Sequence, residues 1–174
     1  GWTLLNFITD SRTGLGRYRD FSMSNSDLMY ALVDWIRARS VQEILSIPDV
    51  AARVDLYRQH EPLYREQLRR IGSLHNGVLT LDMRDEKQIY AGNRFVKYAL
   101  FPDARVSIDI IWGRNRQNTV IAVGKSIFHD VPDVSIGELL LQCGGGGHDG
   151  AGTCQVPNDQ ADDTARRLRE RLAA

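Results

Sequence analysis

The sequence of 174 residues lacks the features that mark several classes of protein. No apolar run approaches the roughly 20 residues that a membrane-spanning helix needs. The opening residues 1–5 contain no basic stretch, so a secretory signal is not expected. The two cysteines, Cys143 and Cys154, are too few for a disulfide framework or a four-cysteine metal site. We therefore expect reduced thiols in a cytoplasmic protein that has no contact with a membrane.

An excess of charge of either sign is also missing, because 22 Lys and Arg residues balance 22 Asp and Glu residues. This balance argues against a globally basic nucleic-acid-binding protein but leaves a local basic patch possible. Lysine is scarce, since 19 of the 22 cationic residues are arginine. Arginine binds phosphate and carboxylate in a bidentate manner, but a bias in codon usage gives the same imbalance. The composition is otherwise that of a folded globular protein, with 43% apolar and 25% charged residues.

The first 24 residues predict one strand and one loop. Residues 3–9 form a short apolar run, which we interpret as a buried strand that ends at Asp10. A loop rich in Gly, Arg and Ser follows up to residue 24. Because the chain opens on glycine inside this predicted strand, we expect it to be a fragment whose upstream residues are missing.

The next segment predicts a series of helices. Its apolar residues recur at helical spacing, and Asn25 or Ser26 is the expected N-cap. The predicted helices cover residues 26–39, 41–46 and 49–71. Pro62 is expected to kink or split the last of them, and Gly72 is expected to end it.

The sequence pattern changes after Asn76, where predicted strands and helices alternate. Residues 106–123 predict an antiparallel hairpin with a polar turn, because apolar and polar residues alternate along them. The other predicted elements are strands 78–83 and 153–156, a helix from 92 to 101, a helix from 135 to 141 and a last helix from 158. The predicted fold class is therefore α/β, with a small mixed β-sheet lobe that is flanked by helices and preceded by a helical connector. The predicted segments are 1–24, a connector over 25–75 and the lobe over 76–174.

The most informative stretch is the glycine run Gly144–Gly147, which His148 follows. Four consecutive glycines are costly to order, and ending a helix needs only one of them. Successive exposed N–H groups can form a cradle for an anion, and the imidazole adds a donor. A P-loop requires a lysine after its glycines, and none follows this run. A dinucleotide-binding motif requires a strand before its glycines, whereas a predicted helix precedes this run. The simpler alternative is a flexible turn with a solvated histidine.

This stretch resembles the C-terminal domain of the DHH phosphoesterases, a superfamily that includes RecJ-like exonucleases and nano-RNases. The resemblance rests on the glycine-histidine run, on the following Ala151-Gly152 and on the strand end Val123–Ser126. It implies that residues 76–174 bind phosphate or a nucleotide through Lys125, Ser126, Gly145, Gly146, Gly147 and His148. Lys125 stands where the family usually has arginine, so a bidentate fork is replaced by a point charge.

In this family a catalytic domain comes first and holds a binuclear metal site, typically of manganese. The Asp-His-His motif of that site is absent here, but Thr9-Asp10-Ser11 with Gly14 and Gly16 resembles another of its motifs. The resemblance therefore implies Asp10 as a metal ligand for Mn²⁺ and residues 1–24 as a remnant of the catalytic domain. The alternative is a loop aspartate that caps a turn. One carboxylate cannot hold two metals, so this chain by itself is expected to be inactive.

Arg94, close to the start of a predicted helix, is a further candidate for contacting phosphate, and a surface ion pair is the alternative. The predicted function is the substrate-binding part of a metal-dependent phosphoesterase that hydrolyses short oligonucleotides, nucleotide phosphates or polyphosphate. The expected partner is a phosphate-containing small molecule or a short single-stranded nucleic acid. Two alternatives are a non-catalytic module that binds nucleotides or nucleic acid, and a domain that serves only in assembly.

Overall fold

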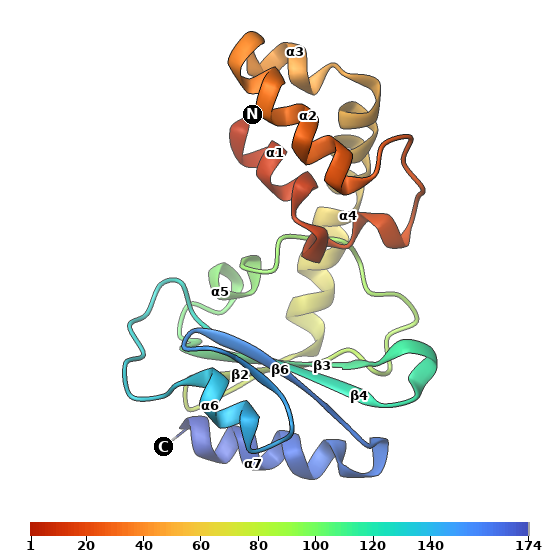
Figure 1. Ribbon diagram of the computed structural model, residues 1–174. Helices are drawn as coiled ribbons and strands as arrows, with labels where there is room; N and C mark the ends of the chain where they lie inside the picture. Colours follow the sequence, from red (N-terminus) through yellow and green to blue (C-terminus); the bar gives the residue numbers. More distant parts are fainter. Residues whose placement is uncertain (174) are drawn as a thin grey trace. The chain divides into compact units, whose positions relative to one another are not determined.

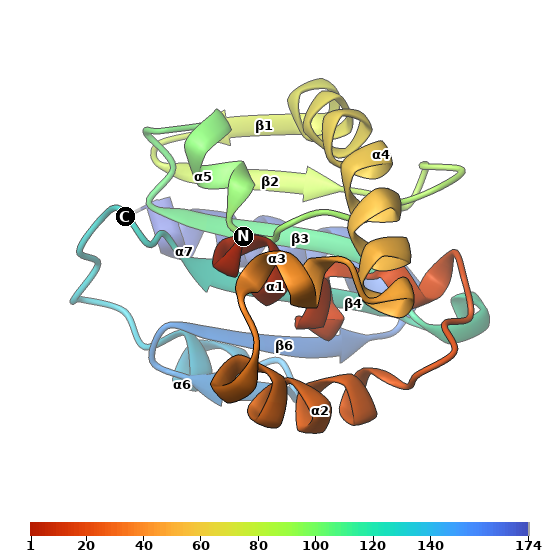
Figure 2. The same cartoon turned by 90° about the horizontal axis from the view of Figure 1, so that it is seen from above.

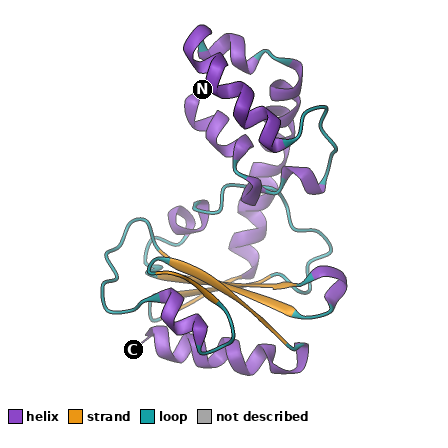
Figure 3. Ribbon diagram, viewed as in Figure 1, coloured by secondary structure: helices purple, strands orange, loops and turns teal. Residues whose placement is uncertain are grey.

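The computed structural model describes residues 1–173 and divides into two compact units (Figure 1). Unit 1 comprises Gly1–Gln67 and Ile89–Val96, and unit 2 comprises Leu68–Gln88 and the chain from Lys97 onward. Unit 1 is helical and unit 2 contains the sheet (Figure 3). Each unit has a core of its own. No helix of the described residues combines the length and apolar character needed to cross a membrane.

Unit 1 is built from helices that pack around a core of aliphatic and aromatic side chains. Its helices are α1 (Trp2–Thr9), α2 (Asn25–Ala38), α3 (Val41–Leu45) and α4 (Pro48–Ile71), whose last turn belongs to unit 2. Two short 3₁₀ turns, Ser11–Thr13 and Leu15–Arg17, follow α1. The short helix predicted over 41–46 is confirmed, and it begins with a capping box between Ser40 and Glu43.

The strand predicted over residues 3–9 is wrong, because this segment is helix α1. Leu5 and Ile8 are both buried, and their spacing of three places them on one side of a helix. An apolar run of this length fits both periods, so the sequence does not separate a buried strand from a buried helix. Asp10 accordingly follows a helix and caps the 3₁₀ turn after it.

The other helix predictions need two smaller corrections. The N-cap of α2 is Ser24, whose hydroxyl accepts a hydrogen bond from the N–H of Asp27, rather than Asn25 or Ser26. Helix α4 runs on through Pro62, so the predicted split does not occur. Buried residues on both sides of the proline, Tyr57 and Tyr64, hold the helix by tertiary packing.

Unit 2 contains a six-stranded mixed sheet. Its strands are β1 (Gly72–His75), β2 (Val78–Asp82), β3 (Val106–Trp112), β4 (Thr119–Lys125), β5 (Gly146–His148) and β6 (Ala151–Val156). Their order is β1-β2-β3-β4-β6-β5, and only β2 and β3 run parallel. Figure 2 looks onto the sheet and shows β1, β2, β3, β4 and β6 in this order. The predicted hairpin over 106–123 is confirmed by the pairing of β3 with β4.

The sequence analysis missed β1, which forms a tight hairpin with β2. Asn76 and Gly77 connect the two strands with φ values of 49° and 78°. Two left-handed residues in a two-residue connection are typical of a type I′ turn, for which Asn-Gly is the preferred sequence. Gly72 ends α4 as predicted and also begins β1.

Helices α6 (Ile136–Leu141) and α7 (Ala161–Ala173) cover one face of the sheet (Figure 1). Ile108 and Ile121 point to this face and are fully buried in the core of the unit. Two 3₁₀ turns, Arg114–Arg116 and Asn158–Gln160, and the short helix α5 (Val96–Leu100) complete the elements. A mixed sheet flanked by helices confirms the predicted fold class of α/β.

Candidate phosphate-binding site

The predicted binding residues of unit 2 gather at one end of the sheet, where β4 ends and the turn between β5 and β6 lies. The N–H of Lys125 donates to the carbonyl oxygen of Gly150 over 2.9 Å, and the N–H of Ile136 donates to that of Asp149 over 3.0 Å. The turn is therefore held on one side by β4 and on the other by the start of α6. This holds the residue that precedes the turn, His148, in a defined place.

The glycine run does not form a continuous cradle of exposed amides, as the sequence analysis expected. The N–H of Gly144 donates to Leu141 and that of Gly145 donates to Leu140. With φ of 71° at Gly144, these bonds form a Schellman motif that ends α6. Both amides are therefore engaged in the helix end. The rest of the run, from Gly146 on, belongs to the edge strand β5, one side of which pairs with no other strand.

Close packing explains two further glycines of the run. A β-carbon on Gly147 would lie 2.2 Å from the carbonyl oxygen of Ala151, and one on Gly145 would lie 2.2 Å from that of Thr153. Neither site has room for a side chain. A β-carbon on Gly146, by contrast, would meet nothing within 4 Å. Gly146 is thus the glycine of the run that neither packing nor a left-handed conformation requires.

His148 and Gly146 lie on the face of the sheet opposite to α6 and α7. Paired residues of an antiparallel sheet share a face, and successive residues of a strand alternate. His148 pairs with Ala151, which pairs with Gly124. Gly146 pairs with Thr153, which pairs with Ala122. We refer to these small residues as the sheet floor: Ala122, Gly124, Gly146, Ala151 and Thr153.

The imidazole of His148 is exposed and oriented by its own turn. Its Nδ1 accepts a hydrogen bond from the N–H of Gly150 over 3.1 Å. In the neutral ring this bond assigns the proton to Nε2. Nε2–H is therefore available as a donor to a ligand beside the sheet floor.

Lys125 and Ser126 lie at the same end of the sheet but do not face the sheet floor. Lys125 shares the face of Val123, and its Nζ forms an ion pair with Asp149 over 2.7 Å. Ser126 is buried, and its hydroxyl accepts a hydrogen bond from the N–H of Phe128 over 3.1 Å. These two residues therefore brace the turn and the loop that follows β4.

The sequence analysis did not single out Arg105, which the fold brings to this end of the sheet. Its carbonyl oxygen accepts a hydrogen bond from the N–H of Ser126 over 2.8 Å. Its guanidinium is exposed and has no hydrogen-bond or ion-pair partner within residues 1–173. A single arginine before a strand carries no sequence signal, because its position depends on pairing between β3 and β4.

A buried polar group that the sequence analysis also missed lies beside the sheet floor. Lys97 is buried and donates to the carboxylate of Asp109 and, over 3.2 Å, to the hydroxyl of Ser107. Tyr98 donates to the carbonyl oxygen of Gly124 over 2.8 Å. The oxygen Oδ1 of Asp109 is buried and has no hydrogen-bond partner in the described part of the chain. Alternation along β3 does not reveal this pair, because Lys97 belongs to a different element, α5.

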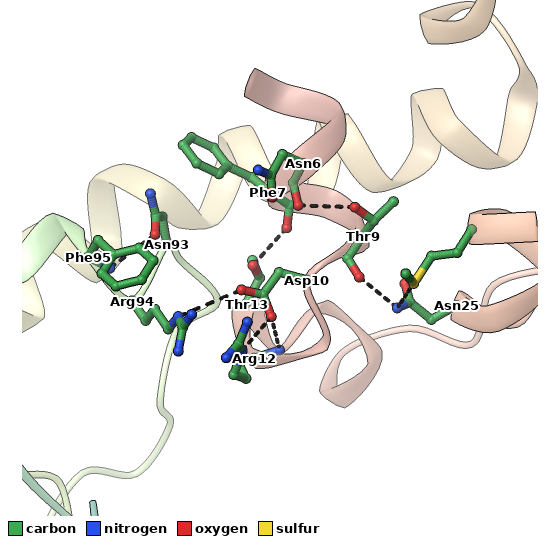
Figure 4. Close-up of polar contacts among 11 residues, drawn as sticks. Asn6, Phe7, Thr9, Asp10, Arg12, Thr13, Asn25, Asn93, Arg94 and Phe95 are labelled. Atoms are coloured by element: carbon green, nitrogen blue, oxygen red, sulfur yellow. Dashed lines mark hydrogen bonds and ion pairs between the residues drawn. The ribbon is translucent and has the colours of Figure 1, made fainter. Parts of the chain in front are cut away.

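Unit 1 contains the other two predicted residues, Asp10 and Arg94, and brings them together (Figure 4). Asp10 Oδ1 accepts hydrogen bonds from the N–H of Arg12 over 3.0 Å and from Arg12 Nε over 2.8 Å. Arg94 Nε lies 3.8 Å from Asp10 Oδ2. Burial raises the pKa of Asp10, but the hydrogen bonds from Arg12 and the charges of both arginines outweigh burial and lower it.

The residues that the structure describes offer Asp10 no partners for a metal site. Among residues 1–173, no group of three or more His, Cys, Asp or Glu side chains is placed to hold a metal ion. Arg12 and Arg94 also put positive charge where a divalent cation would have to bind. The residues present therefore do not fit the binuclear manganese site that the resemblance implies.

Comparisons with known proteins identify a similar solved structure. Neither the models of protein families nor the curated proteins contain a match to this sequence. Among solved structures, the chain is similar to one titled "pGpG-specific phosphodiesterase - PggH from Vibrio cholrae", with a TM-score of 0.89 and 49% sequence identity. The match covers 99% of this chain and 59% of that chain. This chain therefore spans less than two thirds of the length of its structural neighbour.

Proposed function

We propose that this chain is the nucleotide-binding part of a phosphodiesterase that hydrolyses a short substrate such as pGpG. The observation that carries the proposal is the similarity to the pGpG-specific enzyme, at 49% identity over 99% of this chain. The balance of 22 cationic and 22 anionic residues also favours a small substrate over a long duplex.

The end of the sheet offers the chemistry that a nucleotide phosphate requires. Three groups can each supply hydrogen bonds to phosphate oxygens: the Nε2–H of His148, the guanidinium of Arg105 and the edge strand at Gly146. The ion pair of Lys125 with Asp149 holds the turn that carries His148. In this proposal the residues of unit 2 bind and orient the substrate, which lowers the barrier for a reaction elsewhere on it.

Hydrolysis itself needs groups beyond those assembled here. A bound metal such as manganese would supply an activated water and positive charge beside the scissile phosphate, and the residues described here do not hold one. Asp10 is one carboxylate bonded to arginine, so we propose that this chain binds substrate but does not cleave it alone. The same observation keeps a second function open, that of a non-catalytic module for binding nucleotides.

Titration of the chain with pGpG, followed by NMR of the backbone amides, tests the proposed binding. We expect shifts at Gly146, His148 and Arg105. His148→Ala is expected to weaken binding about 10-fold, because it removes one hydrogen bond to a charged group. His75→Ala is the matched control, since His75 is an exposed histidine of β1 at the other edge of the sheet.

Two results would contradict the proposal. Absence of any shift with millimolar pGpG would exclude the nucleotide-binding function. Equal affinities for His148→Ala and His75→Ala would exclude the assigned site. Hydrolysis of pGpG by this chain alone in the presence of Mn²⁺ would overturn the claim that it only binds substrate.

A further inference from the structure

The structure assigns a base-reading role to Asp109: we propose that its carboxylate recognises the Watson–Crick edge of a guanine that lies on the sheet floor. This inference rests on the proposed function, since it identifies how the same site selects its substrate. It follows from three features of unit 2, namely an unpartnered carboxylate oxygen, its position in the sheet and the small side chains between it and His148.

The carboxylate of Asp109 is only partly satisfied. Lys97 binds Oδ2, while Oδ1 is buried and has no hydrogen-bond partner within residues 1–173. A buried oxygen of this kind costs stability unless a donor reaches it. The side chain is 26% exposed, and this exposure belongs to atoms other than Oδ1. The terminal torsion of an aspartate is broad, which allows Oδ1 to turn towards a ligand.

The register of the sheet places this carboxylate in line with the phosphate-binding end. Asp109 pairs with Ala122, which pairs with Thr153, which pairs with Gly146. These residues therefore form one row across β3, β4, β6 and β5. Three strand spacings of about 4.8 Å separate Asp109 from Gly146, or about 14 Å in total. A nucleotide, with phosphate at one end and base at the other, can lie along such a row.

The residues between these two ends leave room for a flat base. Ala122, Gly124 and Ala151 carry no side chain beyond a methyl group, and none of the three is fully buried. A β-carbon on Gly124 would lie 3.5 Å from the hydroxyl of Tyr98, so that hydroxyl lies over Gly124 on this face and leaves Ala122 and Ala151 as the floor for a base. A planar ring can therefore lie against this part of the face with its edge directed at β3.

The chemistry of the carboxylate selects guanine among the bases. The Watson–Crick edge of guanine presents two neighbouring donors, N1–H and the 2-amino group, and a carboxylate accepts from both. Adenine presents an acceptor, N1, at the same place, and it would leave the buried oxygen unsatisfied. Lys97 donates to the other oxygen of Asp109, so Oδ1 is the oxygen left to accept from a base. Asp109 is thus expected to reject adenine as well as bind guanine.

The ratio of the affinities for pGpG and pApA tests this inference. We expect the wild-type chain to prefer pGpG by about 10- to 100-fold, the discrimination typical of one bidentate contact to a base. Asp109→Asn presents both a donor and an acceptor, so the ratio should fall close to 1 while binding of pApA is retained. A general loss of stability affects both ligands, so the ratio cancels it.

Asp82→Asn is the matched control, because Asp82 is a carboxylate of the same sheet that Arg84 binds on the helix-covered face. This variant should keep the wild-type ratio. An unchanged ratio in Asp109→Asn, or equal binding of pGpG and pApA by the wild type, would overturn the inference and leave the proposed function intact. Failure of the wild type to bind either dinucleotide would overturn both. If Asp109→Asn unfolds, Asp109→Glu replaces it and should lower the same ratio by displacing the carboxylate.

Discussion

At the scale of single residues, the glycines from Gly144 to Gly147 have three different kinds of surroundings. Gly144 has a left-handed backbone, and Gly145 and Gly147 face backbone atoms within 2.2 Å of any added β-carbon. Gly146 faces open space on the side of the sheet floor. The glycines of one run therefore divide into those that the fold requires and one that a ligand would require.

Alanine substitutions at Gly146 and Gly147 should distinguish a glycine that faces a ligand from a glycine that close packing requires. Gly147→Ala is expected to destabilise the protein by about 1–3 kcal/mol, because the new methyl group overlaps the backbone of Ala151 and Gly152. Gly146→Ala should be neutral or stabilise it by up to about 1 kcal/mol, since alanine reduces the entropy of the unfolded chain. It should also weaken binding of pGpG by crowding the phosphate.

Urea unfolding and titration with pGpG measure the two effects on the same variants. The interpretation of Gly146 as a ligand-facing residue is wrong if Gly146→Ala binds as the wild type does. A Gly147→Ala variant as stable as the wild type would show that the hairpin can open to accept a side chain.

At the scale of elements, α4 is connected to the segment Ile89–Val96 by a histidine. The N–H of Ala91 donates to Nδ1 of His60 over 3.1 Å, and the rings of Tyr18 and Tyr90 pack against the imidazole. Burial, reinforced by the charge of Arg17, lowers the pKa of His60 below its usual value of about 6.5. The neutral ring is therefore the form that this packing favours.

The stability of unit 1 should fall as the pH decreases below about 6.5, because the unfolded chain then takes up a proton at His60 that the folded chain resists. The loss continues down to the lowered pKa of the folded state. Urea unfolding between pH 8 and pH 5.5, followed by the fluorescence of Trp35 in unit 1, measures this dependence. His60→Asn keeps an acceptor for Ala91 but does not titrate, so its pH dependence should be flatter. Equal slopes for the two proteins would contradict the assignment.

At the scale of the whole molecule, charge is balanced and no sign dominates. The formal net charge at pH 7 is 0, and the sequence gives an isoelectric point of about 7.1. Proteins without net charge lack the mutual repulsion that keeps molecules apart.

The solubility of the chain should therefore pass through a minimum close to pH 7. Precipitation with ammonium sulfate at pH 6, 7 and 8 measures it, with the amount left in solution as the readout. Solubility that falls steadily from pH 6 to pH 8 would contradict this expectation and indicate that a local patch, rather than net charge, governs association.

The sequence predicts much of unit 2 correctly and less of unit 1. The β3–β4 hairpin and helix α6 follow from alternation and from the cap at Ser135, which are local signals. Helix α1 was predicted as a strand because an apolar run of seven residues carries no clear period. Strand β5 was missed because its glycines have low strand propensity, and only pairing with β6 makes them a strand.

The sequence by itself predicted that α4 ends at Gly72 and that α6 ends at the glycine run, because these helix-end signals are local. It also predicted a phosphate-binding site at the glycine-histidine run, because that signal lies in consecutive residues. Only the tertiary structure decided which side chains share a face. Asp109 and Gly146 are 37 positions apart, and the strand register between them sets both their distance and their direction. Such a register arises from long-range packing and hydrogen bonding, which no short stretch of sequence contains.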